Sequence, residues 1–430
     1  MIAFASLFLG LIVGTRPVTV IVGNTVAAVE FELDGRALGR LSEAPWTREV
    51  DFGTEFEPHE LVARAFDEKG GEVALARQWI NLPRPPAEVQ LVLERDARGR
   101  AAWARVTFES ILGVHPNRVS VTFDGKALPF EGGRVAIPGH DPRSTHVLTA
   151  VVDYPDGVQT RNDLVIGGAS SGEAGSELTA VPIRGSERDP PQPAALRGRF
   201  LSHDRPLAVA AVEHGPAQVV VVRDLSCDEA QAALRRGISF HPFGDPSGLG
   251  GKDRLQIVWP VARRFVMRGT SNELFDTSRG FSGKSSSFGF LLTRVDYPPG
   301  PNPDPPRRFT DAVAVAGLHA YGSFSRRAVV LVLGKSGRDD SVYQPAPVRR
   351  YLERLRVPLF VWSLAEPAAR PAAAAAWGEA QDISTGPGLE KAVALLRHDL
   401  DRQSIVWLEG RHLPQHIVLR DGADGLALVR

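Results

Sequence analysis

Cysteine is nearly absent from this chain, and neither sign of charge is in excess. The 430 residues include one cysteine, Cys227, which excludes an intrachain disulfide and any zinc site built from several cysteines. Fifty basic side chains balance fifty acidic ones, so no net field attracts nucleic acid or an anionic membrane surface. We therefore expect no nucleic-acid partner.

Hydrophobic runs of transmembrane length are also missing. Residues 2–13, IAFASLFLGLIV, are uncharged and apolar over the length of a signal-peptide core, which is too short to cross a bilayer. We assign residues 1–17 as a signal-like segment and expect export to the periplasm or the cell surface, with no transmembrane span beyond this segment. No basic residue precedes the apolar core and no clear cleavage site follows it, so an ordinary buried strand is the alternative.

An internal repeat organises the first part of the chain. VEFELDGRAL at residues 29–38 recurs as VSVTFDGKAL at residues 119–128, and HELVA at 59–63 recurs as HVLTA at 146–150. Apolar and polar residues alternate in both copies, which predicts half-buried strands, and each Asp-Gly pair predicts a hairpin turn. The hydrophobic content of 43% is ample for the cores of a multidomain chain of this length.

The repeat predicts two small β-sandwiches in tandem, over residues 18–95 and 96–166. They resemble bacterial immunoglobulin-like modules, without the usual disulfide. His59 and His146 recur at equivalent places, as either metal ligands or strand-edge histidines that fix a loop. We favour the loop role, because no second ligand lies at metal spacing in either copy. Residues 167–197 are rich in Gly, Ser and Pro and predict a linker interrupted by one strand.

The part from residue 198 to 430 has a different pattern, in which buried strands alternate with helices. Four consecutive valines at 219–222 and the run RRAVVLVL at 326–333 indicate strands that are covered on both faces. Helices are expected over 309–321, 348–355 and 388–401, and a β-rich tail over 404–429. A loop is expected over residues 270–287, and a strand is expected over residues 288–293. This alternation predicts a doubly wound, parallel α/β sheet.

An acid-rich turn, DLSCD at residues 224–228, follows the valine strand and leads into an expected helix. Ligands of open α/β sheets gather at the carboxyl ends of the strands, so this turn is a candidate cation site. The segments QVVVVRDLS, RFTDAVAVAG, RRAVVLVLGKSGRDDS and VRRYLERLRVPLFVWS resemble the von Willebrand factor type A fold, and more narrowly its divergent exported form in some soil bacteria. That resemblance implies a Mg²⁺ or Ca²⁺ ion, held by oxygen ligands from three loops and completed by an acidic group of a protein partner.

The family's ligand pattern is only partly present. Asp224 and Ser226 match its first two positions, Asp228 replaces a serine and Thr310 fits the threonine loop. The last acid is displaced to Asp339. Lys335 lies where an acid is usual and would repel a cation. The expected metal ligands are therefore Asp224, Ser226, Asp228, Thr310 and Asp339, with a site that has decayed into a structural turn as the alternative.

No catalytic constellation is recognisable, since a nucleophile elbow and a phosphate-binding loop are both missing from the sequence. We therefore expect a non-enzymatic, exported protein that acts in protein–protein interaction, adhesion or scaffolding, with the type A-like domain as its recognition head. A metal-independent structural component of an envelope or secretion assembly is one alternative. The other is an uncharacterised hydrolase that uses the 270–287 loop with Asp224 and Asp339.

Overall fold

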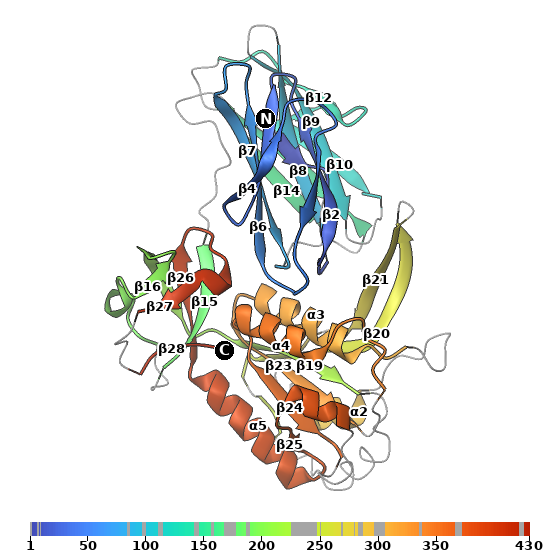
Figure 1. The fold of residues 1–430 in the computed structure, drawn as a ribbon, viewed down its shortest axis with the longest axis vertical. Helices are drawn as coiled ribbons and strands as arrows, with labels where there is room; N and C mark the ends of the chain where they lie inside the picture. Colours follow the sequence, from blue (N-terminus) through green and yellow to red (C-terminus); the bar gives the residue numbers. More distant parts are fainter. Residues whose placement is uncertain are drawn as a thin grey trace. The chain divides into compact units, whose positions relative to one another are not determined.

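The chain folds into two compact units, Met1–Ser176 and Glu177–Arg430, in the computed structural model (Figure 1). The structure describes residues 2–430 except 7, 9, 84–86, 97–99, 111–114, 142–145, 156–158, 167–177, 186–189, 225–246, 250, 268–269, 279, 283–286, 296–305, 335–337, 366–371 and 421–424. Among the helices in these ranges, none combines the length and the apolar character needed to cross a membrane.

The first unit consists of two β-sandwich modules with separate cores. The strands of module 1 are β1 (Ile2–Phe4), β2 (Thr15–Val22), β3 (Ala28–Leu33), β4 (Arg36–Leu41), β5 (Thr47–Asp51), β6 (His59–Phe66) and β7 (Glu72–Ile80). Those of module 2 are β8 (Ala87–Arg95), β9 (Ala101–Ser110), β10 (Arg118–Phe123), β11 (Lys126–Leu128), β12 (Arg134–Ala136), β13 (His146–Asp153) and β14 (Gln159–Ile166).

The two modules share one strand topology. In module 1, the sheet β1-β2-β5 packs against the sheet β4-β3-β6-β7; in module 2, β12-β9-β8 packs against β11-β10-β13-β14. The first to the seventh strand of module 1 and of module 2 occupy corresponding positions in the two sheets. The sequence repeat is therefore a repeat of whole modules. The alternation seen in the sequence directs Phe31 and Leu33 into the core of module 1, and Val121 and Phe123 into that of module 2. The immunoglobulin-like class expected from the sequence is the class found.

The boundary between the modules lies earlier than the expected one at residue 95. Strand β8 pairs with β9 from Ala87 to Arg95 and contributes Val89, Leu91 and Leu93 to the core of module 2. A strand belongs to the sheet that satisfies its hydrogen bonds, and local sequence does not reveal the partner. Module 1 therefore ends with β7.

The described residues of the signal-like segment pack into module 1. Ile2 and Phe4 are buried on β1, which pairs with β2, and the Phe8 ring lies edge-on to Phe52 at 5.6 Å. The buried Asn81 side chain accepts the N–H of Ile12 at 2.6 Å and donates to its carbonyl at 2.8 Å. Of the described residues in the apolar run 2–13, Ile2–Phe4 form a buried strand, and export remains a prediction.

The second unit is built on one large sheet. Its strands are β19 (Ala217–Arg223), β20 (Arg254–Met267), β21 (Thr270–Thr277), β22 (Phe281–Ser282), β23 (Arg326–Leu333), β24 (Leu359–Ser363) and β25 (Gln381–Asp382). The order is β21-β20-β19-β23-β24-β25, parallel from β20 to β25, with β21 antiparallel at the edge. The chain runs outward in both directions from the β19–β23 pair, which makes the carboxyl ends of these two strands a topological switch point.

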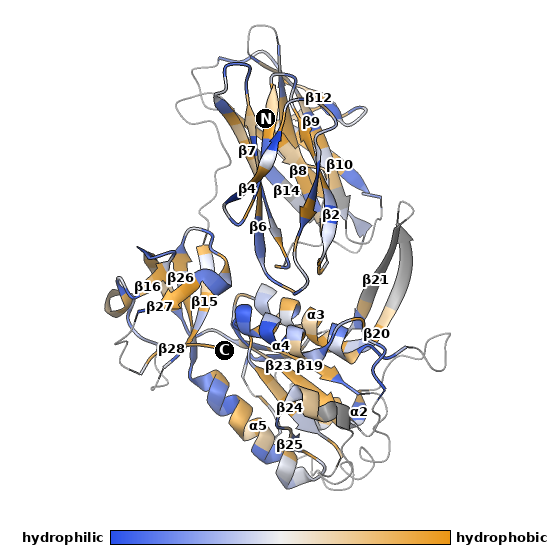
Figure 2. Ribbon diagram, viewed as in Figure 1, coloured by the Kyte–Doolittle hydropathy of each residue, from blue (hydrophilic) through white to orange (hydrophobic). Residues whose placement is uncertain are grey.

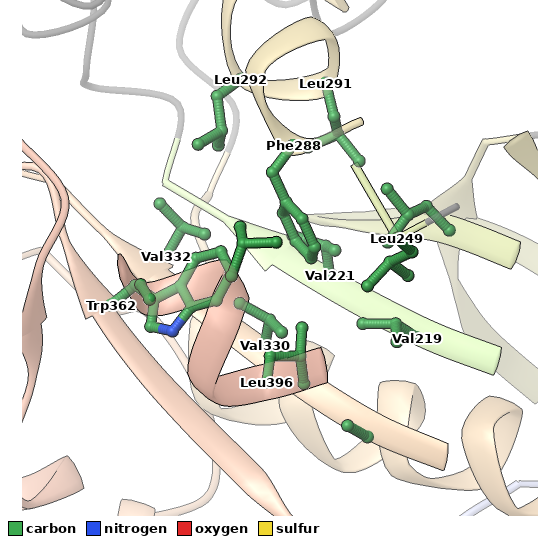
Figure 3. Close-up of a cluster of buried hydrophobic side chains, with 14 of the residues drawn as sticks. Val219, Val221, Leu249, Phe288, Leu291, Leu292, Val330, Val332, Trp362 and Leu396 are labelled. Atoms are coloured by element: carbon green, nitrogen blue, oxygen red, sulfur yellow. The ribbon is translucent and has the colours of Figure 1, made fainter. Parts of the chain in front are cut away.

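Helices cover both faces of this sheet. Its helices are α2 (Phe288–Arg294), α3 (Phe309–Gly322), α4 (Pro345–Arg354) and α5 (Gly386–Asp401), with a short helix η5 (Ala372–Trp377). Helices α2 and α5 pack on the face that presents Val219, Val221 and Val330, as Figure 3 shows for Phe288 and Leu396. Helices α3 and α4 lie on the opposite face (Figure 1). The valines are buried on both sides because of this two-sided cover.

Three buried arginines on the strands cap the carboxyl ends of helices. Arg223 donates to the carbonyl of Val295 after α2 at 2.7 Å, and Arg326 donates to that of Leu400 in α5 at 2.8 Å. Arg327 donates to the two carbonyls that follow α4, each at 3.2 Å. A cation stabilises the negative end of a helix and satisfies carbonyls that the helix leaves open.

Two small sheets complete the second unit. Their elements are β15 (Leu178–Arg184), η2 (Pro193–Leu196), β16 (Phe200–Ser202), β17 (Arg205–Pro206), β18 (Val209–Glu213), β26 (Gln403–Glu409), η6 (Pro414–His416), β27 (Ile417–Leu419) and β28 (Ala427–Leu428). Strand β15 pairs with β26 along its whole length, and Val181 and Ile183 enter a core shared with Val406 and Ile417. The strand that the sequence places in a linker is thus part of the second unit.

Two secondary-structure predictions in this unit were wrong. Residues 270–287 contain the strands β21 and β22, because the 14-residue strand β20 supplies a hairpin partner for β21. Residues 288–294 form the helix α2, which the Ser287 hydroxyl caps by accepting the Phe290 N–H at 3.2 Å. A short apolar run does not distinguish helix from strand. The expected helix after Asp228 lies outside the described residues. In contrast, the predicted helix at 309 and the strand 326–333 are confirmed, and Figure 2 shows the strongly apolar character of β23.

Candidate functional site

Asp224 lies at the switch point, directly after β19. Its N–H continues the parallel ladder by donating to the Val332 carbonyl at 2.9 Å. Its Oδ2 accepts the N–H of Gly334, which follows β23, at 3.1 Å, and its Oδ1 lies 3.9 Å from Nη1 of Arg307. The residue is 1% exposed. The Asp224 carboxylate therefore joins the ends of the two central strands beneath the surface.

Thr310 and Asp339 meet at the amino end of α3. Asp339 accepts the N–H of Phe309 at 3.0 Å, the N–H of Thr310 at 3.3 Å and the Thr310 hydroxyl at 2.7 Å. The residue at the N-cap position, Arg308, makes no side-chain cap of its own. A carboxylate from a distant loop thus satisfies the first amides of α3 and complements the positive end of its dipole.

The loop that carries Asp339 is held in return by the first turn of α3. Ser341 donates to Asp339 Oδ1 from its N–H at 3.1 Å and from its hydroxyl at 2.5 Å, and its hydroxyl oxygen accepts the Asp311 N–H at 3.2 Å. The Asp311 carboxylate accepts the N–H groups of Val342 and Tyr343, each at 3.1 Å. We call this reciprocal contact between residues 339–343 and residues 309–311 the loop clamp.

Asp340 joins Arg307, which precedes the N-cap residue of α3, to the same loop. Its Oδ2 accepts the Arg307 N–H at 2.9 Å, and its own N–H donates to the Arg307 carbonyl at 2.6 Å. The Nε of Arg338 also donates to Oδ2, at 2.9 Å. The loop clamp therefore fixes the backbone from which the Arg307 side chain reaches Asp224.

The described residues of the predicted metal site do not fit a cation. The two oxygens of Asp339 already accept hydrogen bonds from Phe309, Thr310 and Ser341, which engages the lone pairs that a metal would use. Asp224 lies beside a guanidinium group. In the ranges that the structure describes, no three His, Cys, Asp or Glu side chains are grouped to hold a metal ion. Ser226 and Asp228 of the predicted set, and Lys335, lie outside these ranges, so the five-residue site stays a prediction.

Sequence reasoning missed three residues that complete this arrangement, namely Arg307, Asp311 and Ser341. Asp311 occupies the first turn of a predicted helix, where an acid is expected to complement the dipole, and this was the available signal. Arg307 and Ser341 carry no such signal, because the contacts of Arg307 with Asp224 and of Ser341 with Asp311 join segments far apart in the sequence.

The two recurrent histidines fix hairpin turns, as the sequence favoured. His59 Nδ1 lies 2.7 Å from Asp34 Oδ2 in module 1, and His146 Nδ1 lies 2.7 Å from Asp124 Oδ2 in module 2. Both aspartates have positive φ, 52° and 49°, and precede a glycine with φ of 78°, the two-residue turn that tight hairpins prefer. The hydrogen bond that Asp124 accepts from His146 raises the pKa of His146 above its ordinary value, and the same bond lowers the pKa of Asp124.

The sequence matches no protein-family profile and no curated protein. Among solved structures, it is similar to fibronectin(III)-like modules of CbhA from Clostridium thermocellum, with 21% identity over 19% of this chain and 93% of that chain and a TM-score of 0.17. It is also similar to the central fibronectin-III array of RIM-binding protein, with 12% identity over 46% of this chain and 82% of that chain and a TM-score of 0.20.

A third similar structure is SGBP-B of a Bacteroides ovatus mixed-linkage glucan utilization locus, with 11% identity over 49% of this chain and 58% of that chain and a TM-score of 0.14. In each module of the first unit, a three-stranded and a four-stranded sheet form an immunoglobulin-like β-sandwich.

Proposed function

We propose that this chain is a non-enzymatic, exported binding or scaffold protein that acts through protein–protein contacts. The two immunoglobulin-like modules are its spacers, and the second unit is a von Willebrand type A-like recognition head. Two observations support the head: a largely parallel sheet with helices on both faces, and the position of Asp224 at its switch point. A fold alone does not define a partner, because recognition depends on particular loops.

The observation that carries the proposal is the loop clamp. It lies on the side of the sheet where the parallel strands have their carboxyl ends, which we call the carboxyl edge. It holds Val342 with 69% of its surface exposed, while the backbone N–H of Val342 is anchored to Asp311. Arg338 and Asp340 flank it as an exposed ion pair. A rigid loop that presents an apolar side chain with charged neighbours loses little conformational entropy on binding, which favours a recognition role.

The expected Mg²⁺ or Ca²⁺ has no part in this proposal. The expectation of a bound ion rests on the family resemblance and on five residues. Of these, Asp224, Thr310 and Asp339 make the contacts within the chain that are described above. The loop clamp orders the edge with hydrogen bonds of the chain itself.

The proposal is tested by capture of partners on the immobilised full-length chain from envelope extracts of the source organism. Three chains are compared, the wild type, Val342→Glu and Leu395→Glu, since Leu395 is a 45% exposed apolar residue on helix α5. We expect captured proteins that disappear with Val342→Glu and persist with Leu395→Glu. Equal capture by all three chains, or no capture at all, would sink the assignment of this edge as the recognition surface.

A further inference from the structure

Asp224 is a buried carboxylate whose negative charge needs compensation. Its side chain is 2% exposed, and a buried ionised carboxylate is stable only when it is hydrogen-bonded and paired with positive charge. The Gly334 N–H supplies a hydrogen bond to Oδ2. The Arg307 guanidinium lies on the side of Oδ1 and supplies a full positive charge at 3.9 Å.

Arg307 is held in this position by the chain itself. Both its N–H and its carbonyl are bound by Asp340, and its side chain is only 22% exposed. The Asp340 loop is fixed in turn to α3 through Asp339 and Ser341. The guanidinium is thus part of the ordered edge and is not a freely moving surface charge.

A divalent ion and the Arg307 guanidinium compete for the same carboxylate. Two positive charges a few ångströms apart repel strongly, and the repulsion is largest where water is excluded. Asp339, the other carboxylate of the predicted set, has its oxygens engaged by the loop clamp.

We propose that Arg307 is the resident cation of the carboxyl edge, in the place beside Asp224 that a divalent ion would need. The edge is then assembled without metal, and any partner binds it in the presence of a chelator. The consequence for partner binding rests on the proposed function. The charge assignment rests on the contacts of Asp224 and is tested by stability.

The experiment follows thermal unfolding of the full-length chain in EDTA, in millimolar Mg²⁺ and in millimolar Ca²⁺. We expect the wild-type Tm to be the same in all three. Arg307→Gln removes the positive charge beside Asp224 and lowers the Tm in EDTA by about 3–8 °C, and Mg²⁺ or Ca²⁺ restores part of this loss. The double variant Arg307→Gln with Asp224→Asn lacks the buried carboxylate beside which an ion would replace Arg307, so its Tm does not respond to either ion.

Two further variants serve as controls. Arg338→Gln removes an arginine whose side chain contacts Asp340, and we expect its Tm to stay independent of the ions. Arg307→Lys keeps the charge and also stays independent. If Arg307→Gln does not fold, isothermal titration of the wild type with Mg²⁺ and Ca²⁺ decides, since no binding heat is expected.

The inference is overturned if divalent ions raise the wild-type Tm, or release binding heat, and Asp224→Asn abolishes the effect. It is also overturned if Arg307→Gln folds and behaves like Arg338→Gln. Failure to capture any partner would contradict the proposed function, but it would not affect the conclusion on Arg307 and Asp224, which depends on thermal unfolding.

Discussion

The contacts that stabilise turns in the first unit differ from those that stabilise helix ends in the second unit. In the sandwiches, the contact that holds a hairpin turn recurs in both modules: His59 binds Asp34 and His146 binds Asp124, with matching distances and turn angles. In the second unit, Arg327 and Asp339 each cap a helix from another segment of the chain. A contact inside a repeated module is copied with the module, whereas a helix cap in the unrepeated second unit depends on where the sheet brings the chain back.

The largest effect is expected from Arg327→Ala, which breaks the second kind of contact. Arg327 is fully buried, lies 4.6 Å from the centre of the Tyr321 ring and donates to the carbonyls of Leu355 and Arg356. Burial lowers the pKa of Arg327 to about 10, so it is still charged at neutral pH. Its removal leaves two carbonyls unpaired and a cavity, which costs about 3 kcal/mol.

Urea unfolding of the second unit measures this loss, with Arg349→Ala, an exposed arginine of α4, as the matched control. The control is expected to change the free energy of unfolding by less than about 0.5 kcal/mol. Equal effects of the two substitutions would show that the buried cap contributes nothing.

A smaller effect is expected from Asp339→Ala, which removes the cap of α3 and opens the loop clamp. Loss of an N-cap costs about 1–2 kcal/mol. The amides of Phe309 and Thr310, which donate to Asp339, should also exchange with solvent faster. Hydrogen exchange of the full chain checks this, with Glu390→Ala on the exposed surface of α5 as the control. Unchanged protection of both amides would contradict the capping role.

The first unit gives a comparison between the two copies of one contact. His59 is 7% exposed and its ring lies 5.9 Å from that of Phe52, so His59→Ala should cost about 2 kcal/mol through lost packing and a lost hydrogen bond. His146 makes the same contact with more solvent around it, and His146→Ala should cost less. Unfolding of the two variants by urea measures the difference, and an equal loss would mean that the contact itself, and not its burial, sets the contribution.

The smallest effect concerns pH. Because the folded pKa of His146 is raised by Asp124, its charged form stabilises module 2 below the unfolded pKa, and this contribution is lost as pH rises through the folded pKa. NMR titration of the imidazole should give a pKa above the ordinary histidine value, and Asp124→Asn should bring it back down. A pKa of His146 that does not move in the variant would break the proposed link between the two side chains.

Much of the fold was predictable because its signals are local. The period-two alternation around Phe31 and Phe123 predicted the sandwich strands, and the valine run at 219–222 predicted a strand covered on both faces. The candidate site was predictable only in part. Asp224 directly follows the predicted valine strand, but the roles of Thr310 and Asp339 in the loop clamp depend on the return of the chain after β23.

The sequence by itself determined the two repeated modules, their Asp-Gly turns and the buried parallel strands, because side-chain period and turn chemistry act over a few residues. Only the tertiary structure decided that β8 belongs to module 2, that β15 pairs with β26, and that Arg307 lies beside Asp224. These outcomes depend on which distant segment satisfies a strand, a helix end or a buried charge, and hydrogen bonding and charge compensation select that partner in three dimensions.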